Sequence, residues 1–233
     1  WTGAGAPVGA WATGGNLNTA RAAGSGAGAD STSALAFGGS PIPGVAGKTE
    51  LYAGSSWTEV GDLNAGGTSM GGSGIATSAL AYGREDALNS APNADTESWN
   101  GTAWTEVADL NQGRSRLVGV GVSNTSALCI SGLPPPVANV LVEQWNGTSW
   151  TEIADINDGR WALSGNGTIT SALVYGGSDL YASPPRENVG VTESWNGTAW
   201  TEVNDLNTAR RELAGSGADN TSALAFGGSV SPR

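Results

Sequence analysis

The sequence contains no histidine, and its only cysteine is Cys129. A disulfide within one chain, a metal site built from cysteine and histidine, and a histidine-based catalytic triad are therefore excluded. These absences remove the commonest routes to metal-dependent and nucleophilic catalysis, so the search for function turns to binding surfaces and carboxylates.

Positive charge is also scarce. Lysine and arginine together number 10, of which Lys48 is the only lysine, against 21 acidic residues, and the formal net charge is −11 at pH 7. Binding to nucleic acid or to an anionic membrane surface depends on clustered lysine and arginine, so we predict no nucleic-acid partner. No apolar stretch approaches the roughly 18 residues that a membrane-spanning helix needs, and we predict no membrane insertion.

Glycine and tryptophan are abundant, with 37 and 10 copies among 233 residues. This composition suits many short strands joined by tight turns, with aromatic side chains filling the gaps between sheets. The tetrapeptide Thr-Ser-Ala-Leu occurs five times, and successive copies end 45 to 51 residues apart, at Leu35, Leu80, Leu128, Leu173 and Leu224. A period of about 40–50 residues is typical of propellers and solenoids.

Each repeat contains four strand-sized segments. The first reads Arg-x-x-apolar-x-Gly-x-Gly and is clearest in residues 114–121 and 160–167. The second is an apolar run followed by glycine, and such a run predicts burial on both faces. Cys129 lies in this run, where the other repeats have alanine or valine, so we expect a small buried side chain. The third and fourth segments, clearest in residues 96–107, flank Asn-Gly, which predicts a hairpin with a type I′ turn.

These segments predict an all-β fold, a five-bladed β-propeller of four-stranded antiparallel blades, with residues 1–233 forming one domain. The predicted complete blades are residues 21–60, 67–107, 114–153 and 160–203. Residues 210–228 supply only two inner strands. Residues 1–13 resemble an outer hairpin, because Gly9-Ala10-Trp11 aligns with Thr102-Ala103-Trp104. We expect these N-terminal strands to complete the C-terminal blade and so to close the ring.

The string TESWNGTAWTEVADLNQGR, in a repeat whose second strand usually ends in two glycines, resembles the Kelch repeat. That repeat has a double glycine after its second strand, a tryptophan in its fourth, and an arginine opening the next blade. The resemblance extends over all five repeats, although Gly83-Arg84 and Ser131-Gly132 replace the double glycine and five blades are fewer than usual. The repeat wording is also similar to Kelch-like proteins of marine bacteriophages, some of them virion-associated.

The resemblance to Kelch repeats implies where partners would bind. In such propellers the fourth-to-first and second-to-third connections share one face, which commonly recognises other molecules. Loops that vary on a rigid scaffold are where recognition usually lies. The copper chemistry known on the Kelch fold requires histidine ligands, which this chain does not have.

Arginine recurs at the start of the first segment, as Arg21, Arg114, Arg160 and Arg210. One interpretation is an anion site near the mouth of the channel, built from guanidinium groups. The other is that each arginine pairs with a carboxylate of its own or a neighbouring blade and fixes the blade geometry, which the repetition favours. The aspartates just upstream do not have the spacing of a calcium loop. We therefore predict neither a metal ion nor a cofactor.

The residues after these arginines break the repeat. Trp161, Arg116, Arg211 and Glu212 would form an asymmetric patch if they face the mouth of the channel, and an aromatic plane beside charged groups suits a sugar or a peptide. The alternative is ordinary surface residues packed under a loop. The candidate ligand-binding residues are thus Trp161, Arg116, Arg211, Glu212, Arg114, Arg160 and Arg210.

The sequence favours a non-catalytic module outside a cell or on a virion surface. Its partner would be a glycan or protein of a cell surface, or other virion proteins. One alternative is a self-assembling subunit of a fibre or capsid, which would form a homo-oligomer. Another is a glycoside hydrolase, which needs two carboxylates about 5–10 Å apart. The acids that stand outside the repeat pattern are Glu85, Asp86, Asp158, Asp179, Glu187 and Glu212.

Overall fold

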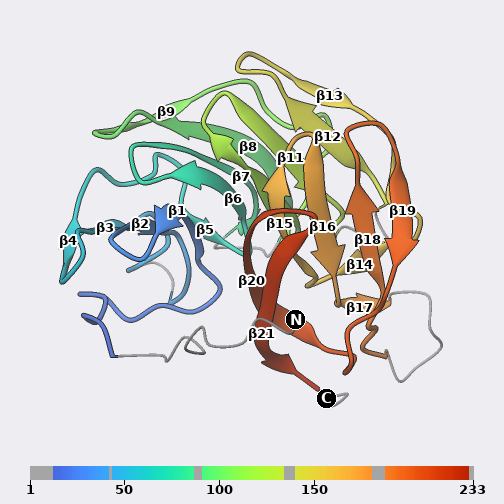
Figure 1. Cartoon of the computed structure of the whole chain (residues 1–233). Coiled ribbons are helices and arrows are strands. Elements are labelled where there is room, and N and C mark those ends of the chain that lie inside the picture. The colour runs from blue at the N-terminus through green and yellow to red at the C-terminus, as the bar shows by residue number, and fades with distance from the viewer. Residues whose placement is uncertain (1–12, 42–43, 87–90, 134–139, 180–186, 231–233) are drawn as a thin grey trace.

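The computed structural model describes residues 13–41, 44–86, 91–133, 140–179 and 187–230. Every regular element in these residues is a β-strand (Figure 1). None of the described residues forms a helix long and apolar enough to cross a membrane. The predicted all-β class is therefore confirmed for this part of the chain.

Three sheets of four strands and one of five stand side by side in chain order, and neighbouring strands in them run antiparallel (Figure 1). The first sheet contains β1 (Ser25–Asp30), β2 (Ser33–Phe37), β3 (Thr49–Tyr52) and β4 (Trp57–Glu59). The second contains β5 (Gly67–Thr68), β6 (Gly71–Ile75), β7 (Ser78–Asp86), β8 (Pro92–Trp99) and β9 (Trp104–Glu106).

The later sheets follow the same plan. The third contains β10 (Val118–Ser123), β11 (Ser126–Ile130), β12 (Val142–Trp145) and β13 (Trp150–Glu152). The fourth contains β15 (Ser164–Thr168), β16 (Ser171–Tyr175), β18 (Thr192–Trp195) and β19 (Trp200–Val203). Two sheets of two strands complete the set: β14 (Arg160–Trp161) with β17 (Ser178–Asp179), and β20 (Arg211–Asp219) with β21 (Ser222–Ser229).

The glycine-rich first strands lie innermost and next to one another. β1 contacts β6, β6 contacts β10, β10 contacts β15, and β15 contacts β20. A Cβ atom on Gly72 of β6 would lie only 2.9 Å from the carbonyl oxygen of Gly26 in β1. The absence of a side chain at this position therefore lets the two inner backbones approach, as the sequence pattern predicted.

In the first four repeats the first segment is not one continuous strand, which corrects the sequence-based expectation. The second residue after the repeated arginine position adopts a left-handed conformation, with φ between 52° and 57°, at Ala23, Ser69, Arg116, Ala162 and Glu212. Non-glycine residues adopt this conformation rarely, because the Cβ atom crowds the backbone. In the first four repeats only the glycine-bearing part beyond this residue continues as the inner strand, whereas β20 runs through Glu212 in the last repeat.

These left-handed residues are linked by backbone hydrogen bonds that pass from sheet to sheet. The N–H of Ser69 donates to the carbonyl of Ala23 at 2.9 Å, and that of Arg116 donates to Ser69 at 2.7 Å. Ala162 donates to Arg116 at 3.3 Å, and Glu212 donates to Ala162 at 2.9 Å. The bonds satisfy polar groups that the bend frees, and they tie the five repeats together at one end of the inner strands.

The outer hairpins lie where Asn-Gly predicted them, but the predicted type I′ turn is wrong. Such a turn needs positive φ at both central residues, whereas only the glycine, for example Gly101 with φ 95°, has it. Asn100 instead accepts hydrogen bonds on its side-chain oxygen from the N–H groups of Thr102 and Ala103, at 2.9 and 3.0 Å. The loop therefore holds four residues between Trp99 and Trp104, which pair across the hairpin.

Aromatic side chains fill the space between neighbouring sheets. Trp104 packs against Phe37 of the preceding sheet with ring centroids 5.0 Å apart, and its indole N–H donates to the Thr49 hydroxyl at 3.0 Å. Trp150 repeats this contact with Tyr82 at 4.8 Å. Each pair combines apolar burial with one directional hydrogen bond, which fixes the angle between two sheets.

The predicted closing blade is only partly described. β20 and β21 form the inner pair, while the outer strands expected from residues 1–13 lie outside the described residues except for Thr13. The described residues therefore form neither five complete blades nor a closed ring.

Cys129 is fully buried in β11, and burial raises the pKa of its thiol to about 12. Only a thiolate reacts with disulfide reagents. We therefore expect no reaction of the native protein with an aromatic disulfide reagent near neutral pH, and reaction of one thiol after unfolding in guanidinium chloride. Rapid labelling of the native protein would contradict the burial of this residue.

Candidate functional site

Three of the repeated arginines form ion pairs with glutamates of the sheets to which they belong. Arg114 binds Glu143 at 2.7 Å, and Arg160 binds Glu193 at 2.9 Å. All four side chains are at most 2% exposed. Arg21 makes the equivalent bond to Glu50 at 2.6 Å. The structure therefore supports the paired interpretation for these three arginines, and it does not bring Arg114 or Arg160 to an open surface.

The carboxylate partner is not one of the upstream aspartates. It is the glutamate of the Thr-Glu-Ser-Trp motif or its variants, such as Glu143 in β12. Asn111, from the connection before this sheet, donates to the same carboxylate through its backbone N–H at 2.8 Å and its side-chain amide at 2.7 Å. The glutamate thus joins the incoming connection, the repeated arginine and the outer hairpin. This glutamate recurs at the same place in every outer hairpin, so the sequence could have indicated it as the partner of the arginine.

In the second repeat, an arginine from a different position in the chain takes the place of the repeated arginine. Gly67 stands where the other repeats have arginine. Arg84, which replaces a glycine at the end of the second strand, binds Asp95 at 2.5 Å and the carbonyl oxygen of Gly66 at 3.3 Å. A guanidinium group therefore occupies this connection too, supplied from another position in the chain.

Substituting Arg160 by methionine should destabilise the fold strongly. The change leaves the buried carboxylate of Glu193 without its cation, and breaking a buried pair in this way costs about 3–5 kcal/mol. Lys48→Met is the matched control, because Lys48 and Glu59 form a solvent-exposed pair, and such pairs contribute little to stability. Urea denaturation measures both, and equal losses in the two variants would contradict the structural role of Arg160.

Stability should also fall in acid. Burial acts to raise the pKa of Glu50, but hydrogen bonds from the Asn18 backbone N–H and from Arg21 outweigh it, so this pKa lies below its ordinary value of 4.5. A lowered folded-state pKa stabilises the fold above the unfolded-state pKa and loses that contribution as the pH falls. Glu50→Gln should therefore lose less unfolding free energy than the wild type between about pH 6 and about pH 3. An equal loss in both would contradict this role.

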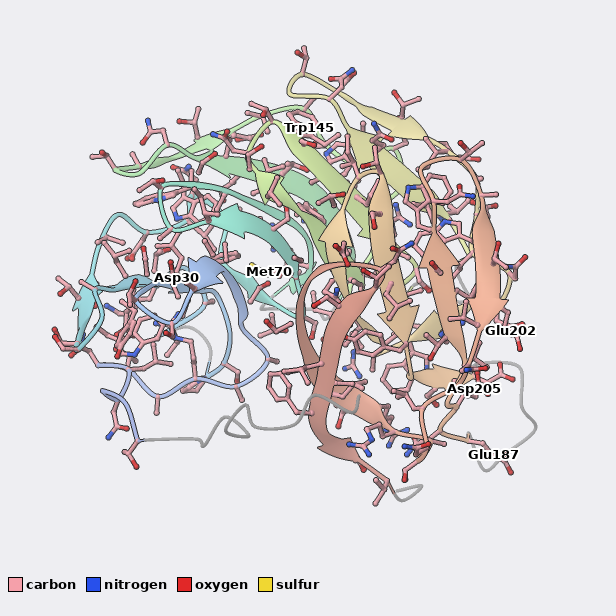
Figure 2. All side chains as sticks on the ribbon, in the orientation of Figure 1. Asp30, Met70, Trp145, Glu187, Glu202 and Asp205 are labelled. Atoms are coloured by element: carbon pink, nitrogen blue, oxygen red, sulfur yellow. The ribbon has the colours of Figure 1, made fainter. Side chains whose placement is uncertain are left out.

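A cavity of about 440 Å³ lies where the inner strands begin. Its wall consists of the five left-handed residues and the residues that follow them: Ala23, Gly24, Ser69, Met70, Arg116, Leu117, Ala162, Leu163, Glu212 and Leu213. Met70, labelled near the inner strands in Figure 2, contributes to the apolar part. Every repeat contributes the same backbone, and the charged side chains among the described wall residues are Arg116 and Glu212.

The second-to-third connections share this end of the molecule. The residue that follows each repeated arginine position bridges to the segment after the second strand, for example Ser115 to Leu133 and Trp161 to Ser178. Glu85, in such a segment of the second repeat, accepts a hydrogen bond from Nε of Arg116 at 2.7 Å. A variable connection therefore reaches the wall of the cavity directly.

Trp161 is buried, with 6% of its surface exposed. Two guanidinium groups lie over its ring, that of Arg116 at 5.2 Å from the centroid and that of Arg211 at 5.5 Å. Cation–π contacts of this kind hold a guanidinium group in place. Trp161 is thus not an exposed platform for a sugar ring, as the patch hypothesis implied; it supports two arginines.

The remaining candidates, Arg211, Glu212 and Arg210, lie in different surroundings. Arg211 is buried beside Trp161, while Glu212 is exposed and borders the cavity. Arg210 points elsewhere, because its guanidinium donates to the carbonyl oxygens of Thr208 at 3.3 Å and Gly227 at 3.2 Å. The structure therefore places Arg116 and Glu212 on the cavity wall, and it places Trp161 and Arg211 behind Arg116, joined by the cation–π contacts.

Sequence reasoning missed Glu85 as a member of this site and treated it only as a possible catalytic acid. The other acids outside the repeat pattern do not meet a second carboxylate here: Glu212 is the only acid among the described residues that line the cavity. A second cavity of about 380 Å³ lies at the opposite end of the inner strands and is lined mainly by glycine and other small residues. It offers little side-chain chemistry.

Comparison with known proteins supports the architecture and no more. The chain matches no protein-family model, and no curated protein matches it in sequence. A solved structure entitled "Structure of YjhT" superposes with a TM-score of 0.73 at 15% sequence identity, covering 90% of this chain and 78% of that one. The chain has an all-β, propeller-like fold. At this identity, the similarity extends to the fold alone.

Proposed function

We propose that the chain is a five-bladed, Kelch-like β-propeller and a non-catalytic binding module, with residues 1–13 completing the last blade. It recognises a glycan or a protein through the face that carries the second-to-third connections. The resemblance to phage proteins supports display outside a cell or on a virion surface, where the partner is a cell-surface molecule or another virion protein.

One observation carries this proposal. The cavity wall repeats the same backbone five times, yet charge enters it at two positions, Arg116 and Glu212. Arg116 is held there by Glu85 and by the indole of Trp161. A regular scaffold with one irregular, pre-positioned charged cluster is the arrangement expected of a recognition site.

The binding hypothesis is tested with the double variant Arg116→Met, Glu212→Gln. Both side chains are at least partly exposed, so the fold should persist while binding to glycan arrays or host cells weakens by at least roughly tenfold, about 1.4 kcal/mol. Trp161→Ala is a poorer choice, because removing a buried tryptophan costs about 3–5 kcal/mol of stability. Lys48→Met should bind like the wild type. Full binding by a folded double variant would refute the site.

A propeller glycoside hydrolase is the second hypothesis, with Glu212, which lines the cavity, and Glu85, which binds the cavity residue Arg116, as its carboxylates. It is the weaker one, because Glu85 is engaged by Arg116 at 2.7 Å. Turnover of a polysaccharide that is abolished by Glu212→Gln would favour it over the binding module.

A further inference from the structure

The arginine of the last repeat is oriented like the others but has no glutamate beside it. The guanidinium group of Arg114 donates to the carbonyl oxygen 17 residues ahead and to the carboxylate of Glu143. Arg21 makes the same two bonds. Arg210 makes the first of them, to Gly227 at 3.2 Å, and it belongs to none of the ion pairs among the described residues. Its orientation therefore suits a carboxylate that the described part of the chain does not supply.

In the four larger sheets, a glutamate of the third strand pairs with a small residue of the second strand. The pairs are Ala36–Glu50, Ala81–Glu97, Cys129–Glu143 and Val174–Glu193. Ala225 of β21 holds the equivalent position, and among the described residues β21 pairs with β20 alone (Figure 1). Leu224 is 67% exposed, whereas the matching leucine of the first three sheets is at most 2% exposed. The edge of β21 that faces away from β20 thus combines apolar surface with an oriented arginine.

The fourth sheet offers the matching place for the tryptophan of an outer hairpin. In the second sheet, Trp150 packs on Tyr82 and its indole N–H donates to the hydroxyl of Thr96. Tyr175 and Thr192 are paired across their strands as Tyr82 and Thr96 are. Both threonine hydroxyls donate to the carbonyl oxygen two residues earlier. A hydroxyl oxygen can also accept, so Thr192 is placed to receive an indole N–H.

Residues 1–13 contain a tryptophan for this place but no acid for the arginine. The alignment that puts Trp11 at the repeated tryptophan puts Ala4 at the repeated glutamate, and none of these 13 residues is acidic. A hydrogen bond between a guanidinium group and a carboxylate is stronger than one between neutral groups. A hairpin that carries the glutamate therefore satisfies Arg210 better than this segment can.

We propose that the outer edge of β21 is a strand-exchange site. A β-hairpin of another polypeptide, with the pattern Thr-Glu-x-Trp, displaces residues 1–13 and pairs with β21, and its glutamate binds Arg210. This inference rests on the proposed completion of the last blade by residues 1–13, and it adds an interaction surface distinct from the cavity.

The physics of strand addition determines what the partner must carry. Main-chain hydrogen bonds to a sheet edge give affinity, and pockets for side chains give specificity. Here Arg210 selects the glutamate, while Tyr175 and Thr192 select the tryptophan. Because residues 1–13 are tethered, they compete at a high effective concentration. The incoming hairpin must gain through its carboxylate what it loses by being untethered.

The test is calorimetric titration of the full chain with a synthetic peptide of residues 192–203, the outer hairpin of the fourth sheet, up to about 1 mM. The control peptide carries Glu193→Gln. The wild type should bind the first peptide at least roughly tenfold more tightly, and Arg210→Met should remove this difference. Lys48→Met, which removes a cation elsewhere, should keep it. Failure of the wild-type chain to bind the first peptide, or equal affinity for both peptides, would overturn the proposal.

Ala4→Glu supplies an independent measurement. The change gives the chain's own segment the missing acid, so the unfolding temperature should rise and the affinity for the peptide of residues 192–203 should fall by at least roughly tenfold. Adding Arg210→Met should cancel both effects. If Ala4→Glu alters neither the unfolding temperature nor the peptide affinity, residues 1–13 are not the segment that is displaced, and the exchange is refuted.

Two results separate this proposal from recognition at the cavity. If the peptide does not bind while Arg116→Met, Glu212→Gln abolishes glycan or cell binding, the binding module stands and the exchange site is wrong. If the peptide binds in an Arg210-dependent way while that double variant keeps full glycan or cell binding, the exchange site stands and the cavity is not the recognition site.

Discussion

The rest of the structure depends on one buried carboxylate in each sheet. Glu143 accepts hydrogen bonds from Arg114 and from both the backbone and the side chain of Asn111. It thereby connects the chain entering a sheet, the start of the inner segment and the outer hairpin. Because a buried ion pair is stable only when its remaining hydrogen bonds are made, the three segments hold a single arrangement. That arrangement fixes where the chain emerges at the cavity.

The residue two positions after the repeated arginine adopts a left-handed conformation and lines the cavity, so its side chain is available for recognition. Its backbone N–H donates to the left-handed residue of the preceding repeat, for example from Arg116 to Ser69. The conformation is therefore imposed by the surroundings rather than by the residue itself, and alanine, serine, arginine and glutamate all adopt it. Side chains can vary at this ring without altering the scaffold, which is how a symmetric backbone carries an asymmetric site.

The sequence predicted what depends on periodicity and residue size. Strand segments, glycines at the inner strands and the burial of Cys129 follow from local pattern, because each repeat gives the same answer independently. The left-handed residues could not be predicted, since nothing in Ala23 or Arg116 favours positive φ. The type I′ turn was wrong because the amide of Asn100 competes for backbone donors, an option that the Asn-Gly pair does not reveal. The burial of Trp161 depends on Arg116 and Arg211, which come from different repeats and meet only in the folded chain.

Comparison among the arginines separates architecture from recognition more sharply than comparison among repeats. Arg114 and Arg211 are both buried, yet the guanidinium group of Arg114 has a carboxylate at 2.7 Å, whereas that of Arg211 lies over the ring of Trp161. Arg114 therefore stabilises its own sheet, whereas Arg211 and Arg116 lie over one indole ring supplied by a third repeat and so connect three repeats near the cavity. A repeated residue type can thus serve a single sheet at one position and join several repeats at another.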